Sequence, residues 1–141
     1  GTYRAIDEMQ RFLDYFPNSE RAKQAQDIIF ELQDKLVYKE LLNAQLYYNL
    51  GNYMGNNYQS AIITAQNALK EYPYTRYKET LSMLILKSKY QEAVQSIEEK
   101  KPERFRDVID EYYSFINDYP SGEYSKEAEN IFKVANKYVK D

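Results

Sequence analysis

The sequence predicts an all-α protein of about six helices. Gly and Pro are scarce, four of each in 141 residues, and nearly all of them separate stretches whose apolar residues recur every three or four positions. Three of the prolines also close copies of one recurring pattern. We therefore expect helices at residues 3–16, 19–50, 58–72, 75–97, 103–119 and 122–139.

The second expected element is unusually long, because residues 18–50 contain neither Gly nor Pro and are rich in good helix formers. Its apolar positions step by three and four, first through Ala22, Ala25, Ile29, Leu32 and Leu36, then on a rotated face through Val37, Leu41, Ala44, Tyr47 and Tyr48. The segment is therefore either one long helix or two abutting helices, and its halves should pack against different neighbours.

Local signals mark where several elements begin. Ser19, Thr75 and Ser121 follow prolines and are side chains suited to capping the next helix. Pro102 fits the first turn of the helix expected at 103–119, where a missing N–H does no harm. Residues 51–58, with two glycines, predict an extended turn before the third helix.

A repeat becomes visible when the chain is aligned on three aromatic–proline pairs, Phe16-Pro17, Tyr72-Pro73 and Tyr119-Pro120. Matching residues recur twelve positions earlier (Ala5, Ala61, Val108), five earlier (Phe12, Ala68, Phe115) and four earlier (Leu13, Leu69, Ile116). The copy with Tyr58, Ala61, Ala68 and Pro73 resembles the second helix of a tetratricopeptide repeat. The intervals between prolines exceed the nominal repeat of about 34 residues, so insertions are expected.

The tetratricopeptide resemblance implies helical hairpins stacked in a right-handed superhelix, forming a single domain over residues 1–141. Small side chains at Ala61, Ala65 and Ala68 should let paired helices approach closely. A repeat hairpin does not bury its apolar face alone. The chain starts in what resembles the second helix of a hairpin, so we expect a further repeat upstream.

Composition excludes much chemistry. The chain has no Cys, His or Trp but 16 Tyr and 6 Phe, so thiolate, zinc–thiolate, iron–sulfur and imidazole chemistry are absent. Asp107, Asp110 and Glu111 are close on one expected helix, but 22 acidic residues create such clusters by chance. No phosphate loop, serine elbow or metal-ligand spacing occurs. We therefore expect no enzyme activity, no cofactor and no metal.

The net charge and the hydropathy of the chain limit the kinds of partner that we expect it to bind. The formal net charge is −3 and the isoelectric point is about 5.2, which argues against a nucleic-acid surface. The most apolar run, residues 81–86, is far shorter than the roughly 20 residues of a membrane span. Protein partners remain the expectation.

Amide side chains form the first candidate binding set. Gln45, Asn49 and Asn52 would share one face if the helix extended to Asn52, and amides on an inner face can bind an extended peptide backbone. Asn56 and Asn57 follow closely. The alternative, which we favour, is a solvated face followed by an Asn- and Gly-rich turn.

Tyrosines and arginines form the second candidate set. Tyr58, Tyr72 and Tyr119 have packing positions in the repeat, whereas Tyr53 has none. Tyr112 and Tyr113 cannot both point inward, because neighbours on a helix are about 100° apart. Residues 98–106 carry mixed charge, including Arg104 and Arg106, which predicts a solvated loop between helices or, less favoured, a docking point for an acidic partner.

The combined motifs resemble one family over nearly the whole chain. They are Phe16-Pro17-Asn18-Ser19, Leu36-x-x-Lys39-Glu40, Ala44-x-x-Tyr47-Tyr48-x-x-Gly51-Asn52-Tyr53, Ala61-Ile62 and Glu71-Tyr72-Pro73-x-Thr75. This pattern resembles BamD, a tetratricopeptide lipoprotein of the outer-membrane β-barrel assembly machinery. It is most similar to Bacteroidetes-type members and to the C-terminal part of the family's fold.

The resemblance implies a non-catalytic scaffold at the periplasmic face of the outer membrane. Its partners would be the barrel-forming assembly subunit and accessory lipoproteins, and its membrane contact a lipid anchor on an N-terminal Cys upstream of this sequence. The alternative is a periplasmic module that holds extended segments of unfolded outer-membrane clients in a concave groove. A role in DNA uptake is a third and weaker hypothesis, because the acidity of the chain argues against DNA contact.

Overall fold

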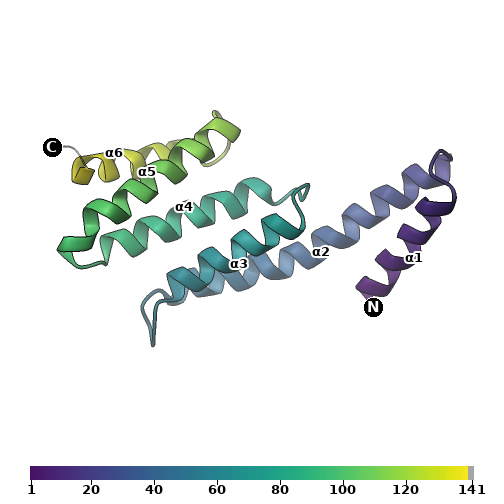
Figure 1. The fold of residues 1–141 in the computed structure, drawn as a ribbon, viewed down its shortest axis with the longest axis horizontal. Helices are drawn as coiled ribbons and strands as arrows, with labels where there is room; N and C mark the ends of the chain where they lie inside the picture. Colours follow the sequence, from purple (N-terminus) through teal and green to yellow (C-terminus); the bar gives the residue numbers. More distant parts are fainter. Residues whose placement is uncertain (140–141) are drawn as a thin grey trace.

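The computed structural model describes residues 1–139, which form an all-helical fold without a strand among them. Figure 1 shows how the helices follow one another along the chain. Their bounds are α1 Thr2–Tyr15, α2 Glu20–Leu50, α3 Asn57–Glu71, α4 Lys78–Val94, α5 Lys101–Asp118 and α6 Ser125–Val139, with a short 3-10 helix, η1 Glu98–Lys100, before α5. The expected fold class and helix number are confirmed.

Each helix packs against the next one along the chain, so the fold is a stack of antiparallel hairpins (Figure 1). Helix α2 runs behind two neighbours, with α1 against its first half and α3 against its second half. Helix α4 additionally touches both α2 and α6. This hairpin packing is that of a tetratricopeptide-like fold.

Helix α2 is one continuous helix of 31 residues, which settles the alternative that the sequence left open. At about 1.5 Å per residue it is roughly 46 Å long. The Ser19 hydroxyl caps it as expected, accepting a hydrogen bond from the Ala22 N–H at 3.0 Å. Between buried Ile29 and Val37 the helix turns through eight residues, a net rotation of about 80°. The predicted change of face is therefore confirmed.

The three aromatic–proline pairs have the same structural role. Phe16, Tyr72 and Tyr119 each form the C-cap of a helix, with φ of −133°, −127° and −134°. The N–H of each bonds to the carbonyl four residues earlier. A residue before proline is disfavoured in the α conformation, so the helix ends there. Each aromatic–proline pair of the sequence repeat thus marks the C-terminal end of a helix.

Several predicted boundaries are wrong. Thr75 does not cap α4, because the turn continues through Tyr77 and the helix begins only at Lys78, so that the Thr75 hydroxyl accepts from the Tyr77 N–H before the helix. Ser121 lies four positions before the start of α6. Residues 98–106, expected as a loop, are η1 and the start of α5, where Pro102 lies in the first turn as predicted.

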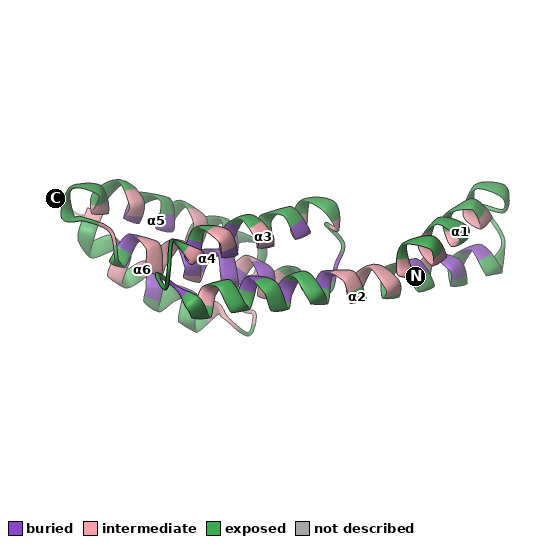
Figure 2. Ribbon diagram, turned by 90° about the horizontal axis from the view of Figure 1, so that it is seen from below, coloured by how far each residue is buried: buried purple, intermediate pink, exposed green. Residues whose placement is uncertain are grey.

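Two apolar cores lie on opposite sides of α4. Buried residues of α2, α3 and α4 form the first core, Val37, Leu41, Ala44, Ile62, Ala65, Ala68, Leu81, Leu84 and Ile85. Residues of α4, α5 and α6 form the second, Met83, Leu86, Ala93, Phe105, Val108, Phe115, Ala128, Ile131 and Ala135. The small residues expected to permit close approach, Ala61, Ala65 and Ala68, are all buried. Helix α1 contributes no fully buried residue (Figure 2).

Polar contacts of Asp34 with Thr75 and Arg76, together called the polar clasp here, fix the α3–α4 turn to the middle of α2. The Asp34 carboxylate accepts a hydrogen bond from the Thr75 hydroxyl at 2.6 Å and lies 3.9 Å from the Arg76 guanidinium. The Thr75 oxygen in turn accepts from the Tyr77 N–H at 3.3 Å. Thr75 is only 8% exposed, so losing its partner leaves a buried polar group.

We expect Thr75→Val to lower the free energy of unfolding by about 1–3 kcal/mol, because the shape is kept while the buried hydrogen bonds are lost. Urea denaturation followed by circular dichroism measures the change. Thr64→Val, at a half-buried position of α3, is the matched control. Equal midpoints for the two variants would show that the clasp contributes nothing.

Candidate functional site

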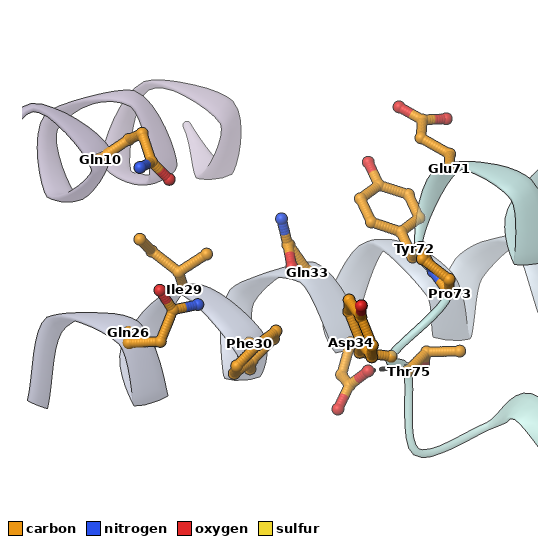
Figure 3. Close-up of a pocket in the computed structure, with 11 residues that line it drawn as sticks. Gln10, Gln26, Ile29, Phe30, Gln33, Asp34, Glu71, Tyr72, Pro73 and Thr75 are labelled. Atoms are coloured by element: carbon orange, nitrogen blue, oxygen red, sulfur yellow. Dashed lines mark hydrogen bonds between the residues drawn. The ribbon is translucent and has the colours of Figure 1, made fainter. Parts of the chain in front are cut away.

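Two neighbouring cavities, together called the groove here, lie over α2 between α1 and the C-terminal end of α3, and Figure 3 shows the first of them. The cavities have volumes of about 320 and 350 Å³, and both are lined by Glu71 and Tyr72. The groove exists because α1 and α3 pack on successive segments of the same long helix. Ile29 and Phe30 of α2 form apolar floor in the first cavity, where Pro73 lines the opposite end.

Amide side chains line the groove on all three helices. They are Gln10 of α1, Gln26, Gln33 and Asn43 of α2, and Asn67 of α3. An amide side chain both donates and accepts hydrogen bonds, as a peptide backbone does. Beside apolar surface, this lining can bind an extended segment without selecting one side-chain sequence.

The charges of the groove are mostly acidic. Asp34, Glu40 and Glu71 line it, against a single lysine, Lys39. The Asp34 carboxylate is already engaged by Thr75 and Arg76. The remaining acidic charge favours a segment that carries Lys or Arg.

Tyr72 lies where the two cavities meet. Burial is the largest cause that raises the pKa of Tyr72, and together with the Glu71 carboxylate and the Tyr3 hydroxyl it raises this pKa to about 12. The phenol therefore remains neutral at physiological pH and can both donate and accept a hydrogen bond. Sequence analysis had assigned Tyr72 to packing, and it also packs against the first core.

The predicted amide set does not form one surface. Helix α2 ends at Leu50, and Gly51 leaves it with φ of 56°, so Asn52 cannot share a helix face with Gln45 and Asn49. Both Gln45 and Asn49 are exposed, and Gln45 lines a small cavity of about 60 Å³ against α4 and Tyr124.

The other asparagines hold the α2–α3 turn. Asn52 donates to the Gln95 side chain, and Asn56 donates to Glu92 at 2.8 Å while accepting from the Gln59 N–H at the start of α3. Asn57 donates to the Tyr53 carbonyl at 2.7 Å. These contacts agree with the structural interpretation of the set as a turn.

Gly51 is required in this turn for two reasons. Its φ of 56° with ψ of −117° is a conformation that side chains disfavour. A Cβ here would also stand 2.7 Å from the Tyr58 hydroxyl. That hydroxyl accepts a hydrogen bond from Gln95 at 3.0 Å, so turn, α3 and α4 are tied together.

The remaining candidates lie on the turn and on α5. Tyr53 is 68% exposed. Tyr112 stacks on Phe132 with ring centroids 4.6 Å apart, while Tyr113 is 55% exposed, so the expectation that one of the pair is exposed is confirmed. Arg106 is exposed, whereas half-buried Arg104 lines a polar cavity with Asp107.

The groove is the site that sequence reasoning missed. Gln26 and Gln33 are seven residues apart and so lie on one side of α2, which is the signal that could have found it. Its other walls come from α1 and α3, and only the packing of both on α2 brings them together.

The carboxylates Asp107 and Glu111, which are close together in the sequence of α5, lie beside different basic side chains. Glu111 is 2.8 Å from the Lys89 ammonium, and Asp107 lines the polar cavity beside Arg104. Within residues 1–139, no three Asp or Glu side chains are grouped to hold a metal ion. None of the helices described there combines the length and apolar character needed to cross a membrane.

Hairpin stacking along the chain defines an all-α protein with a tetratricopeptide-like fold, which here carries an amide-lined groove and exposed aromatic side chains. The chain belongs to the YfiO family of outer membrane lipoproteins, whose model matches residues 2–79. That match covers α1, α2, α3 and the start of α4, and therefore the whole groove. The resemblance to BamD is confirmed at the level of the family. No curated protein matches the chain.

Deprotonation of Tyr72 should destabilise the protein above pH 10. Because the folded pKa of about 12 exceeds the ordinary value of 10, the stabilisation is complete below pH 10 and is lost as the pH rises towards 12. In the Tyr72→Phe variant, the free energy of unfolding should therefore fall less between pH 10 and pH 12 than in the wild type. Urea midpoints between pH 8 and 12 measure it, and an unchanged pH slope in the variant would contradict the assignment.

Proposed function

We propose that this chain is a non-catalytic docking subunit in the assembly of outer-membrane β-barrel proteins. The observation that carries the proposal is the family match across α1–α3. The subunit faces the periplasm and binds the barrel-forming assembly subunit and accessory lipoproteins through its helix surfaces. The sequence motifs favour a Bacteroidetes-type member.

The form of the molecule supports a docking role. Large apolar and aromatic side chains are exposed on several helices, including Leu46 at 56%, Ile97 at 59% and Tyr113 at 55%. Two cores and the polar clasp hold the helices that carry these side chains. A partner therefore meets a preformed surface and pays little ordering entropy on binding.

Residues of α5 are candidate contacts for one partner. Tyr113 and Arg106 are exposed on this helix, and Tyr and Arg are the side chains most often important in protein interfaces. Tyr113 lies 5.5 Å from the Phe132 ring of α6, so the two helices together present an aromatic surface.

The groove favours a second function, the holding of extended segments of unfolded client chains. Its five amide side chains and its apolar floor match a peptide backbone with alternating side chains. The two functions are compatible, because the groove lies between α1 and α3 while Tyr113 lies on α5.

Affinity purification from outer-membrane extracts tests the docking role. We expect the full-length lipoprotein to retain the barrel-forming subunit in a fixed stoichiometry, and a Tyr113→Ala/Arg106→Ala variant to retain roughly tenfold less. Arg4→Ala, exposed on α1, is the control. Recovery of unfolded barrel proteins without any assembly subunit would contradict the docking role and leave client binding as the function.

Fluorescence anisotropy with a labelled, unstructured ten-residue peptide from a strand of an outer-membrane barrel tests the groove. Gln26→Ala/Gln33→Ala should weaken binding roughly tenfold, because each lost hydrogen bond costs about 0.5–1.5 kcal/mol. Gln66→Ala, at an exposed glutamine outside the groove, should bind as the wild type does. Equal affinity of all three proteins would remove the groove as the peptide site.

A further inference from the structure

The groove over α2 has a counterpart over α4. A polar cavity of about 230 Å³, called the α4 cavity here, lies over α4 between α3 and α5, as the groove lies over α2 between α1 and α3. The residues that line it are Gln59, Ile62 and Gln66 of α3, Lys89 and Glu92 of α4, and Arg104 and Asp107 of α5.

The sequence repeat assigns the groove and the α4 cavity to the same positions. Pro17 and Pro73 are 56 residues apart, and residues that line the groove have counterparts 56 residues later that line the α4 cavity. The pairs are Tyr3 and Gln59, Gln10 and Gln66, Gln33 and Lys89, and Leu36 and Glu92. Figure 3 shows Gln10 and Gln33 in the groove. Because successive repeats pack on their neighbours in the same way, the α4 cavity is the groove of the next repeat.

Only the width of α3 separates the two sites. Asn67 lines the groove, whereas its neighbour Gln66 lines the α4 cavity. Ile63 lies one turn earlier between these two side chains and is 47% exposed. A helix with its side chains is about 10–12 Å wide and an extended chain spans about 3.3–3.6 Å per residue, so roughly four residues cross α3. One extended segment can therefore reach both sites.

The α4 cavity differs from the groove because charged side chains replace an amide and a leucine. Most of these charges are already satisfied. The Lys89 ammonium is 2.8 Å from the Glu111 carboxylate, and Glu92 accepts a hydrogen bond from Asn56 at 2.8 Å. Asp107 is exposed, so water solvates its carboxylate.

Arg104 is the charged group of this cavity that a ligand would best satisfy. It is half-buried, and no carboxylate of residues 1–139, Asp107 included, lies within 4.0 Å of its guanidinium. A half-buried charge without a counter-charge retains a desolvation cost, which a ligand carboxylate would offset. The planar guanidinium also binds a carboxylate through two parallel hydrogen bonds. The α4 cavity therefore favours Asp or Glu, whereas the groove favours Lys or Arg.

We propose that the α4 cavity is a second binding site for the extended client segment that occupies the groove. The segment places a Lys or Arg in the groove, crosses α3 over Ile63 and places an Asp or Glu at Arg104. This inference rests on the proposed client-binding function of the groove. The second contact is intramolecular once the first has formed, so it raises the affinity for segments with this charge pattern.

Fluorescence anisotropy with labelled, unstructured peptides and the full-length lipoprotein tests the second site. The short peptide has ten residues with one Lys and no acid. Two long peptides of twenty residues continue it with uncharged residues and one Glu, one at its N-terminal end and one at its C-terminal end. We expect one long peptide to bind about tenfold more tightly than the short one. Equal affinity of all three peptides would overturn the proposal.

Variants of Arg104 test the chemistry. Arg104→Gln should lower the affinity for the tighter long peptide to that for the short one and leave the short one unchanged. Lys126→Gln, at an exposed base of α6 that lines neither site, should change neither affinity. Lys in place of the peptide's Glu should abolish the gain, and Arg104→Glu should restore it, with circular dichroism showing that all variants fold. A gain that persists in Arg104→Gln would contradict the assignment.

The second site and the groove can fail separately. If the short peptide binds through Gln26 and Gln33 but neither long peptide binds more tightly, the groove holds and the second site is wrong. If the short peptide does not bind the wild type, client binding in the groove and the second site both fail, and the docking role is unaffected.

Discussion

The continuity of α2 is the constraint on which the rest of the structure depends. One helix of 31 residues serves as the partner of α1 along its first half and of α3 along its second half. Because a helix cannot bend freely to suit each neighbour, the buried face rotates by about 80° between Ile29 and Val37. The spacing and direction of the first two hairpins follow from that rotation. The Asp34 clasp then fixes the α3–α4 turn against the same helix, and α4 carries the stack onward between two cores.

The same continuity leaves surface that a compact domain would bury. Helices α1 and α3 meet α2 at successive segments and do not close over it, which creates the amide-lined groove. The side of α2 that turns away from α3 carries an apolar ridge of exposed side chains, Tyr38, Leu42, Leu46 and Leu50. A helix shared by two hairpins therefore presents a polar groove and an apolar ridge. These two surfaces differ in chemistry.

The repeat made the architecture predictable, because each aromatic–proline pair stops a helix by a local backbone restriction. The helical hairpins, the buried alanines of α3 and the exposure of one tyrosine from Tyr112 and Tyr113 followed from spacing alone. Thr75 was misassigned as a cap because the turn after Pro73 runs on through Tyr77, so that α4 starts at Lys78 and the Thr75 hydroxyl accepts from the Tyr77 N–H before the helix. The face that Gln45, Asn49 and Asn52 would share if the helix reached Asn52 does not form, because Gly51 ends the helix with a positive φ beside Tyr58.

The sequence by itself determined the all-α class, the repeat, the absence of thiol and imidazole chemistry and the resemblance to a lipoprotein family. These depend on composition and on contacts between residues close along the chain. Tertiary structure alone decided that α2 is unbroken, that Tyr72 lies between two cavities and that Leu42 and Leu46 remain exposed while Leu41 is buried. The physical reason is that leucines on either side of a helix are equivalent in a periodic pattern. Only the packing of a neighbouring helix against one side of α2 decides which leucines are buried and which stay exposed.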